Sequence, residues 1–359
     1  MKNVKNILMF ITVSAFLFSS AQRVNSLGGN VGYWAGDDNE WTMFPHTLNN
    51  SNLAQVAGLG TESAHEAYVR WGEGTKWGFS WNQANANDML NLQWGNGTMG
   101  ATFGFGMASY DDGIAKGDDT CTPSASNDCV DATSSMGLNA SFGMAMGFGD
   151  LGVGFYQNSG DDGTGATDQA AAMGFWANIR RAQNLWVFDN MLAGFSFGSD
   201  NNTGASVSAD AETNMSLTTS FFTHLDIADG TTGLLAMGFG YYANAALDGV
   251  KDATETTIVL PSWTFAVESG MTDWATCRVG LTSAYVLSNT VNSGLADAKD
   301  VTNSGTNTTN WSVGLGFNYG SFNLDLDVEE DLFTNPVQHV TGYEPISGDN
   351  ATATLTYTW

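Results

Sequence analysis

Two short motifs in the sequence match patterns that carry chemistry in other proteins. Residues 194–198 (GFSFG) have the spacing of a serine nucleophile elbow, and Gly147, Gly149 and Gly152 have the spacing of a dinucleotide-binding turn. An elbow needs a strand-turn-helix corner, whereas Ser196 lies at the end of an alternating strand. A strand also follows the three glycines, which is typical of a tight hairpin. We therefore expect no enzyme and no nucleotide cofactor.

The histidines and acidic loops are also weak candidates for chemistry. The four histidines lack the close spacing to His, Cys or carboxylates that builds a zinc site; they are His46, His65, His224 and His339. Residues 111–119 and 200–204 offer oxygen ligands for weak calcium binding, but they lack a full set of spaced ligands and are more typical of solvated loops. No metal and no other cofactor is predicted.

A different set of charged residues lies on the polar side of segments in which apolar and polar residues alternate. Its members are Arg70, Lys76, Arg180, Arg278, Glu268, Asp325, Asp327 and Glu329. In a water-filled pore, opposed charges of this kind set up a transverse field that selects solutes by charge and dipole. The alternative is that they only pair with one another in a narrow or plugged lumen. The choice between these alternatives depends on the structural elements that carry the charges.

Those elements are strands with a period of two. Residues 136–148 alternate between Met, Leu, Ala or Phe and small or polar residues, and residues 99–107, 235–245 and 311–317 repeat the design. About fifteen such segments follow residue 65, and bacterial single-chain barrels have even strand numbers. The sequence predicts an all-β fold, a transmembrane antiparallel β-barrel of 14–16 strands. A count of 16 requires that part of the region before residue 65 joins the wall.

The connections between these segments support a barrel rather than a soluble sandwich. They alternate between short turns and long acidic loops, as expected for periplasmic turns and outer loops. Tryptophans and tyrosines gather beside the short turns, as in an aromatic girdle at the lipid headgroups. The whole chain has 37 acidic and 11 basic side chains, which argues against nucleic acid as a partner.

The N-terminal region divides into two parts before the barrel. Lys2 and Lys5 precede an apolar run that ends at Phe18, so residues 1–21 are predicted to be a signal peptide cleaved before Gln22. Residues 22–64 do not alternate, and the barrel is predicted over residues 65–359. Export through an oxidising compartment favours a loop disulfide between Cys121 and Cys129.

The C-terminal strand resembles the signal by which the insertion machinery recognises bacterial outer-membrane proteins. Leu355, Tyr357 and Trp359 occupy alternate positions and the last residue is aromatic, although most members of the class end in Phe. The resemblance implies a multi-pass protein of the bacterial outer membrane, with membrane lipid and that machinery as partners. Residues 22–64 weakly resemble the segment that fills the lumen as a hatch in FadL-like transporters; a plain periplasmic lead-in is the alternative.

These observations favour a channel that resembles general porins and lets small solutes diffuse passively. Such channels are often trimers, so the resemblance raises a homotrimer as one option. A FadL-like transporter of hydrophobic compounds is the first alternative, which would need a hatch and an apolar pocket. A structural or surface-recognition barrel with a closed lumen is the second. The sequence does not identify the solute.

Overall fold

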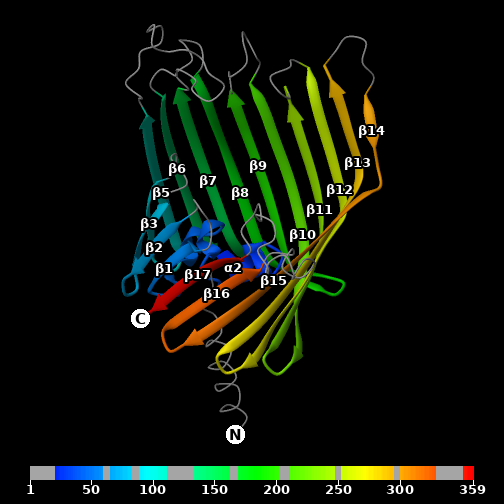
Figure 1. Ribbon diagram of the computed structural model, residues 1–359. Coiled ribbons are helices and arrows are strands. Elements are labelled where there is room, and N and C mark those ends of the chain that lie inside the picture. The colour runs from blue at the N-terminus through cyan, green and yellow to red at the C-terminus, as the bar shows by residue number, and fades with distance from the viewer. Residues whose placement is uncertain are drawn as a thin grey trace, which may run out of the picture.

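The protein is a closed antiparallel β-barrel with short helices inside it (Figure 1). The computed structural model describes residues 21–59, 65–82, 89–110, 133–161, 169–201, 211–246, 252–294, 300–328 and 351–359. Within these ranges, no helix has the length and apolar character needed to cross a membrane. The predicted loop disulfide, Cys121 with Cys129, lies outside the described residues.

Each strand pairs antiparallel with its neighbours. The strands are β1 Leu53–Leu59, β2 Glu66–Trp71, β3 Lys76–Asn82, β4 Leu90–Gly95, β5 Met99–Tyr110, β6 Thr133–Met146, β7 Gly149–Asp161, β8 Gln169–Leu185, β9 Phe188–Asn201, β10 Glu212–Ala228, β11 Thr231–Ala245, β12 Ala253–Thr272, β13 Ala275–Ser293, β14 Val301–Asn303, β15 Thr306–Tyr319, β16 Phe322–Val328 and β17 Ala351–Thr358. β14 and β15 pair with successive parts of β13, so they form one interrupted strand of a 16-strand wall.

The strand that closes the barrel is β1. It pairs with β17 on one side, where Leu53 lies opposite Thr358, and with β2 on the other, where Leu53 lies opposite Arg70. The predicted transmembrane barrel is therefore confirmed, with the higher of the two strand counts. The wall begins at Leu53 rather than at residue 65, because seven residues of the region before residue 65 form this strand.

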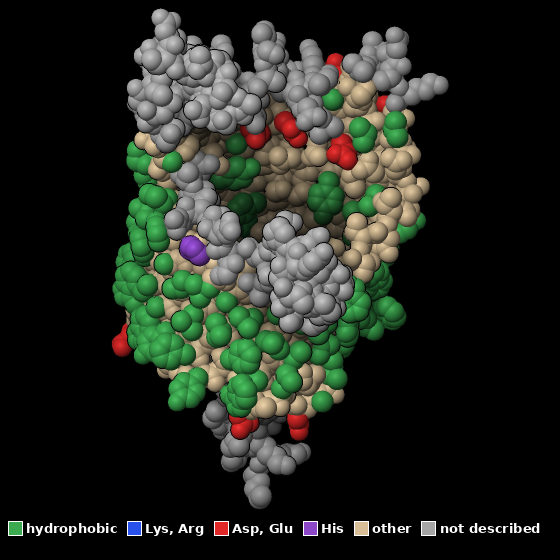
Figure 2. Space-filling model, viewed as in Figure 1, with side chains coloured by type: hydrophobic (Ala, Val, Ile, Leu, Met, Phe, Trp, Pro, Cys, Tyr) green, Lys and Arg blue, Asp and Glu red, His purple; other side chains and the backbone are tan. Residues whose placement is uncertain are grey.

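The alternation of the sequence corresponds to the two faces of the wall. Met107 on β5 and Met136 on β6 point outward, and 61% and 48% of their surfaces are exposed. Thr102 on β5 points inward and is buried. Figure 2 shows hydrophobic side chains covering the outer surface of the lower wall, with acidic side chains at its edges. Apolar side chains face outward and polar side chains face inward, which is the reverse of a soluble protein and is the pattern of a barrel in lipid.

The strands differ greatly in length around the wall. β12 and β13 have 20 and 19 residues, whereas β2 and β4 have six each. Figure 1 shows the long strands rising behind the short β16 and β17. Outward aromatic residues mark the end with the short turns: Trp186 and Tyr319 are 88% and 86% exposed beside the turns after β8 and β15.

The segment before β1 folds inside the barrel as four short helices. They are α2 Ala21–Ser26, η1 Val31–Tyr33, η2 Glu40–Thr42 and η3 Pro45–Asn50. Asn30 caps η1 by accepting a hydrogen bond from the backbone N–H of Gly32 at 3.0 Å. Helices of three to six residues are not stable alone, so their geometry depends on the surrounding wall. Residues 21–50 are called the hatch below.

Candidate functional site: the hatch and the lumen above it

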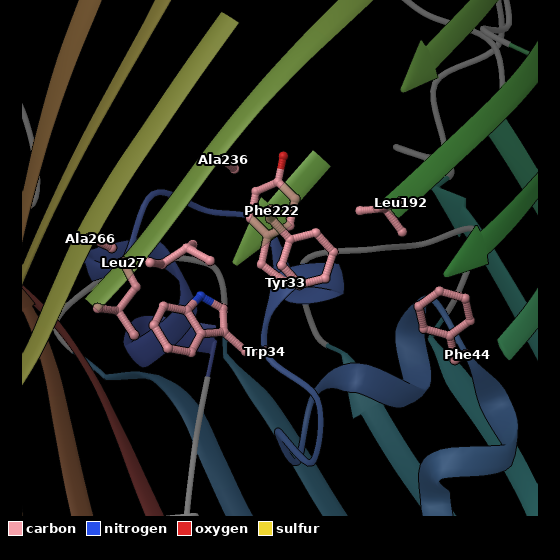
Figure 3. Close-up of a cluster of buried hydrophobic side chains, with 9 residues drawn as sticks. Leu27, Tyr33, Trp34, Phe44, Leu192, Phe222, Ala236 and Ala266 are labelled. Atoms are coloured by element: carbon pink, nitrogen blue, oxygen red, sulfur yellow. The ribbon is translucent and has the colours of Figure 1, made fainter. Parts of the chain in front are cut away.

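An apolar cluster anchors the middle of the hatch to the wall. Tyr33 packs on Phe222 of β10 with ring centroids 5.0 Å apart, and its hydroxyl donates to Ser220 Oγ at 3.0 Å. Trp34 meets His224 edge to face at 5.2 Å. Figure 3 shows these hatch side chains, together with Leu27 and Phe44, among side chains of the wall strands. The cluster buries apolar side chains of the hatch against the wall.

The first of three charged networks joins α2 to the wall. Arg23 of the hatch donates to Asp37 Oδ2 at 2.7 Å and to Glu268 Oε2 of β12 at 2.6 Å. Glu268 also accepts from Arg278 of β13 at 3.2 Å, and Arg278 donates to Asp325 of β16 at 2.6 Å. Three of the residues predicted to line a pore therefore form a chain of ion pairs that ends on the hatch.

The second network lies about Arg180 of β8. Its guanidinium pairs with Glu40 of the hatch and donates to Asp150 Oδ2 of β7 at 2.6 Å. The other oxygen of Asp150 lies 3.0 Å from Nε2 of His46, which also belongs to the hatch. Arg180 further lies 4.9 Å from the ring centre of Phe44. One wall cation thus contacts three parts of the hatch, directly or through Asp150.

The third network lies about Arg70 of β2, which is fully buried. Its Nη1 is 3.7 Å from Asp38 Oδ1 of the hatch, and its Nη2 donates to the backbone oxygen of Asp38 at 2.8 Å. Its Nε donates to the Tyr68 hydroxyl at 2.8 Å, and the Tyr68 ring stacks on Trp41 of the hatch at 5.5 Å. This contact fixes the indole of Trp41 at the upper surface of the hatch.

The other predicted site residues lie at further positions of the wall or outside the described residues. Lys76 reaches Asn52, just before β1, at the end with the short turns. Asp327 lies two residues above Asp325 on β16, and Glu329 falls outside the described residues. Leu355, Tyr357 and Trp359 are exposed on the outer side of β17, where the last two rings stack at 5.8 Å. Their role as an insertion signal stays a prediction.

Sequence reasoning did not identify the hatch partners of the wall charges. These are Arg23, Asp37, Asp38, Glu40 and His46, all in the region that does not alternate. Each of them is at least 95% buried. The concentration of acidic residues in a short segment ahead of a barrel was the available signal, because it complements inward arginines on the wall.

Burial and pairing act in opposite directions on the charges of the hatch. Burial raises the pKa of Glu40 above its ordinary value, although the Arg180 guanidinium opposes the shift. For Arg23, burial lowers the pKa, but Glu268 and Asp37 outweigh it and the net shift is upward. Arg23 is therefore a firmly charged anchor, whereas the carboxylate of Glu40 is held at a cost.

A belt of glycines on the wall receives the backbone of the hatch. Gly95, Gly100, Gly143 and Gly152 lie side by side on β4, β5, β6 and β7. A Cβ at Gly143 would lie 2.6 Å from the nitrogen of Pro45, and Cβ atoms at the other three would overlap or crowd hatch atoms as well. The wall is therefore shaped for a docked hatch on these four strands, because only glycine leaves the required space.

Above the belt, the register of the same strands builds a polar cavity. The inward residues that pair across these strands form rows. The first row above the glycine belt contains Thr102, Ser141 and Trp176, and the second contains Asn91, Asn139 and Tyr156. All six line a cavity of about 370 Å³ whose floor is Trp41 and Thr42 of the hatch. None of its lining residues in the described ranges is Asp, Glu, Lys, Arg or His. The inward side chains of the wall thus change from charged at the level of the hatch to neutral at the level of the cavity.

The comparisons with known proteins identify no family for this chain. No protein-family model and no curated protein matches the sequence. Among solved structures, a bacterial polysaccharide outer membrane secretin is similar over 86% of this chain and 97% of its own, with 8% identity and a TM-score of 0.40. A porin of Rh. blastica matches over 86% and 99%, with 11% identity and a TM-score of 0.28.

A third similar structure is the ferric yersiniabactin uptake receptor FyuA from Yersinia pestis. It matches over 77% of this chain, with 8% identity and a TM-score of 0.37, and this chain spans 53% of the receptor. At these values the similarity is no guide to what the chain transports or binds.

Proposed function

We propose that this chain, a multi-pass β-barrel of the bacterial outer membrane, is a gated transporter of small polar solutes whose hatch closes the lumen at rest. Passage then requires movement of residues 21–50. The proposal keeps solute transport, as expected from the porin-like sequence, but it replaces unrestricted diffusion with diffusion controlled by the hatch. It contains no catalytic step.

The observation that carries the proposal is the pairing of wall charges with the hatch. Arg70, Arg180 and Glu268, on three separate parts of the wall, each bind a hatch residue of opposite charge. The hatch also contacts β3 to β6 through η3, and β13 and β15 to β17 through α2. A segment held on so many sides obstructs the cross-section that a 16-strand barrel would otherwise leave open.

The lining above the hatch favours polar solutes over hydrophobic ones. A FadL-like transporter of hydrophobic compounds needs an apolar pocket at this level, but the cavity carries amide and hydroxyl groups on four adjacent strands, β4 to β7. Burial of an apolar solute against these groups would leave their hydrogen bonds unmade.

The proposal is tested by solute entry into liposomes that contain the refolded protein. The intact chain is compared with a chain lacking residues 22–50, which keeps β1 and the complete wall. We expect slow entry of a small neutral solute such as glycerol through the intact barrel and rapid entry after the deletion. The folded barrel is checked in both samples by its electrophoretic mobility before and after heating.

Two outcomes would contradict the proposal in different ways. Equal, rapid entry through both chains would mean that the hatch does not gate and that the protein is an open porin. No entry through either folded chain would favour a structural or surface-recognition barrel. A homotrimer and recognition by the insertion machinery remain separate proposals that this experiment does not address.

A further inference from the structure

We propose that the cavity on top of the hatch is a binding site for a neutral carbohydrate of one or two sugar units. This inference rests on the proposed transport function and names the class of solute. The cavity lies where a solute entering from the loop side first meets the hatch, because Trp41 and Thr42 form its floor. Its volume of about 370 Å³ is at the small end of the usual range for small-molecule sites.

The hydrogen-bonding groups of the cavity suit a molecule rich in hydroxyls. Asn91, Asn139 and Asn158 each offer an amide that donates and accepts, and Thr102 and Ser141 add hydroxyls that lie 2.6 Å from each other. A sugar hydroxyl also donates and accepts, so it can match either end of an amide. Without a formal charge in the lining, a charged solute would lose its hydration with no ionic partner in return.

Some of these groups are buried without a hydrogen-bond partner. Only 7% of the surface of Asn91 is exposed, and its Oδ1 has no hydrogen-bond partner among the described residues. Nε1 of Trp41, in the floor, is likewise buried and unpaired. Buried polar groups in folded proteins are normally satisfied, so unpaired groups at a cavity indicate a ligand or ordered water.

Two aromatic rings complete the site, and the wall is built to hold them. Gly154 leaves space for the indole of Trp176, which lies over it on the luminal face, and Gly174 leaves space for Tyr156, whose ring is 2.7 Å from where a Cβ would be. Aromatic rings held in this way offer flat apolar surfaces beside polar groups. The apolar C–H face of a pyranose ring stacks on such surfaces while its hydroxyls bind the amides.

The test is isothermal titration calorimetry of the full chain in detergent micelles, with glucose and maltose as probes. Glucose 6-phosphate is the charged counterpart, and cyclohexanol is the ring with a single hydroxyl. We expect binding of at least one of the two sugars and binding of both counterparts that is weaker by about tenfold or more, because one lost or mismatched hydrogen bond costs about a factor of ten and cyclohexanol lacks several.

Variants then locate the binding. Trp176→Leu and Asn139→Ala are expected to weaken sugar binding by roughly tenfold each. Asn244→Ala is the matched control, because Asn244 lies on β11, on another part of the wall, and does not line the cavity. Only variants that keep the folded barrel by heat-dependent mobility are compared.

The inference is overturned if neither sugar binds, if the counterparts bind as tightly, or if both cavity variants bind like the intact chain. These results leave the gating proposal standing when deletion of the hatch still accelerates solute entry. If deletion of the hatch does not accelerate solute entry but sugar binding is normal, the gating proposal fails and the sugar-binding site stands.

Discussion

The two levels of the lumen use different chemistry on the same strands. At the lower level, Arg180 on β8 is ion-paired and contacts the hatch. Four residues earlier on the same strand, Trp176 lines a cavity without formal charge. Inward charge on a barrel wall is therefore not by itself evidence of ion selection. Here the charges hold a segment of the chain in place, and the neutral level above them is left for a solute.

The largest effect is expected from removing a wall cation. Arg180→Ala leaves Glu40 and Asp150 without their partner, and breaking a buried ion pair in this way costs about 3–5 kcal/mol. We expect the amides of the hatch to lose protection in hydrogen exchange while the strands of the wall keep theirs. Arg181→Ala is the control, because that neighbouring side chain makes only an exposed hydrogen bond to the backbone oxygen of Ala182, at 3.4 Å. Equal loss of protection in both variants would mean that Arg180 has no special role in docking.

A smaller effect is expected from filling the glycine belt. The Cβ introduced by Gly143→Ala would crowd Pro45, and overpacking of this kind costs about 1–3 kcal/mol. Hydrogen exchange should therefore show partial loss of hatch protection. Gly147→Ala on the adjoining turn meets no atom within 4 Å and should leave protection unchanged. A Gly143→Ala variant with full protection would show that the close contact is not required.

The smallest effect concerns pH. Because burial raises the pKa of Glu40 in the folded protein, the folded form takes up a proton there more readily than the unfolded form. The contribution of Glu40 to stability is thus present below the ordinary pKa and is lost as pH rises through the raised pKa. The free energy of hatch opening, measured by hydrogen exchange, should rise relative to that of Glu40→Gln as the pH is lowered from neutral toward the ordinary pKa of a glutamic acid side chain. If the free energy of hatch opening in the intact chain instead falls relative to that of Glu40→Gln on acidification, the pKa of Glu40 is lowered rather than raised in the folded protein.

The wall could be predicted from the sequence because its signal is local. Residues 136–148 were expected to alternate as a strand and β6 spans Thr133–Met146, since lipid on one side and lumen on the other impose a period of two. β1 escaped prediction as a strand because its inward residues Leu53 and Ala57 are apolar and buried, so apolar and polar residues do not alternate along it.

The lower site could be predicted only in part. The inward arginines on β2, β8 and β13 follow from alternation, but their partners lie in a segment with no regular pattern. The belt of glycines was visible in the sequence, yet Gly152 was interpreted as part of a hairpin turn. The role of Gly152 in receiving the hatch depends on the strand register, which places this glycine beside Gly143 and against Met43 of the hatch. Register across four strands is a property of the folded wall.

The most direct test of the account is single-channel conductance in a planar bilayer. The intact chain is compared with an Arg23→Ala/Arg180→Ala variant, in which two of the three charged networks are broken, and with Arg181→Ala. We expect a silent or briefly opening channel for the intact chain and the control, and long openings for the double variant. Steady conductance from the intact chain, or a silent double variant with a folded barrel, would contradict the claim that the charges of the lower lumen hold the hatch closed.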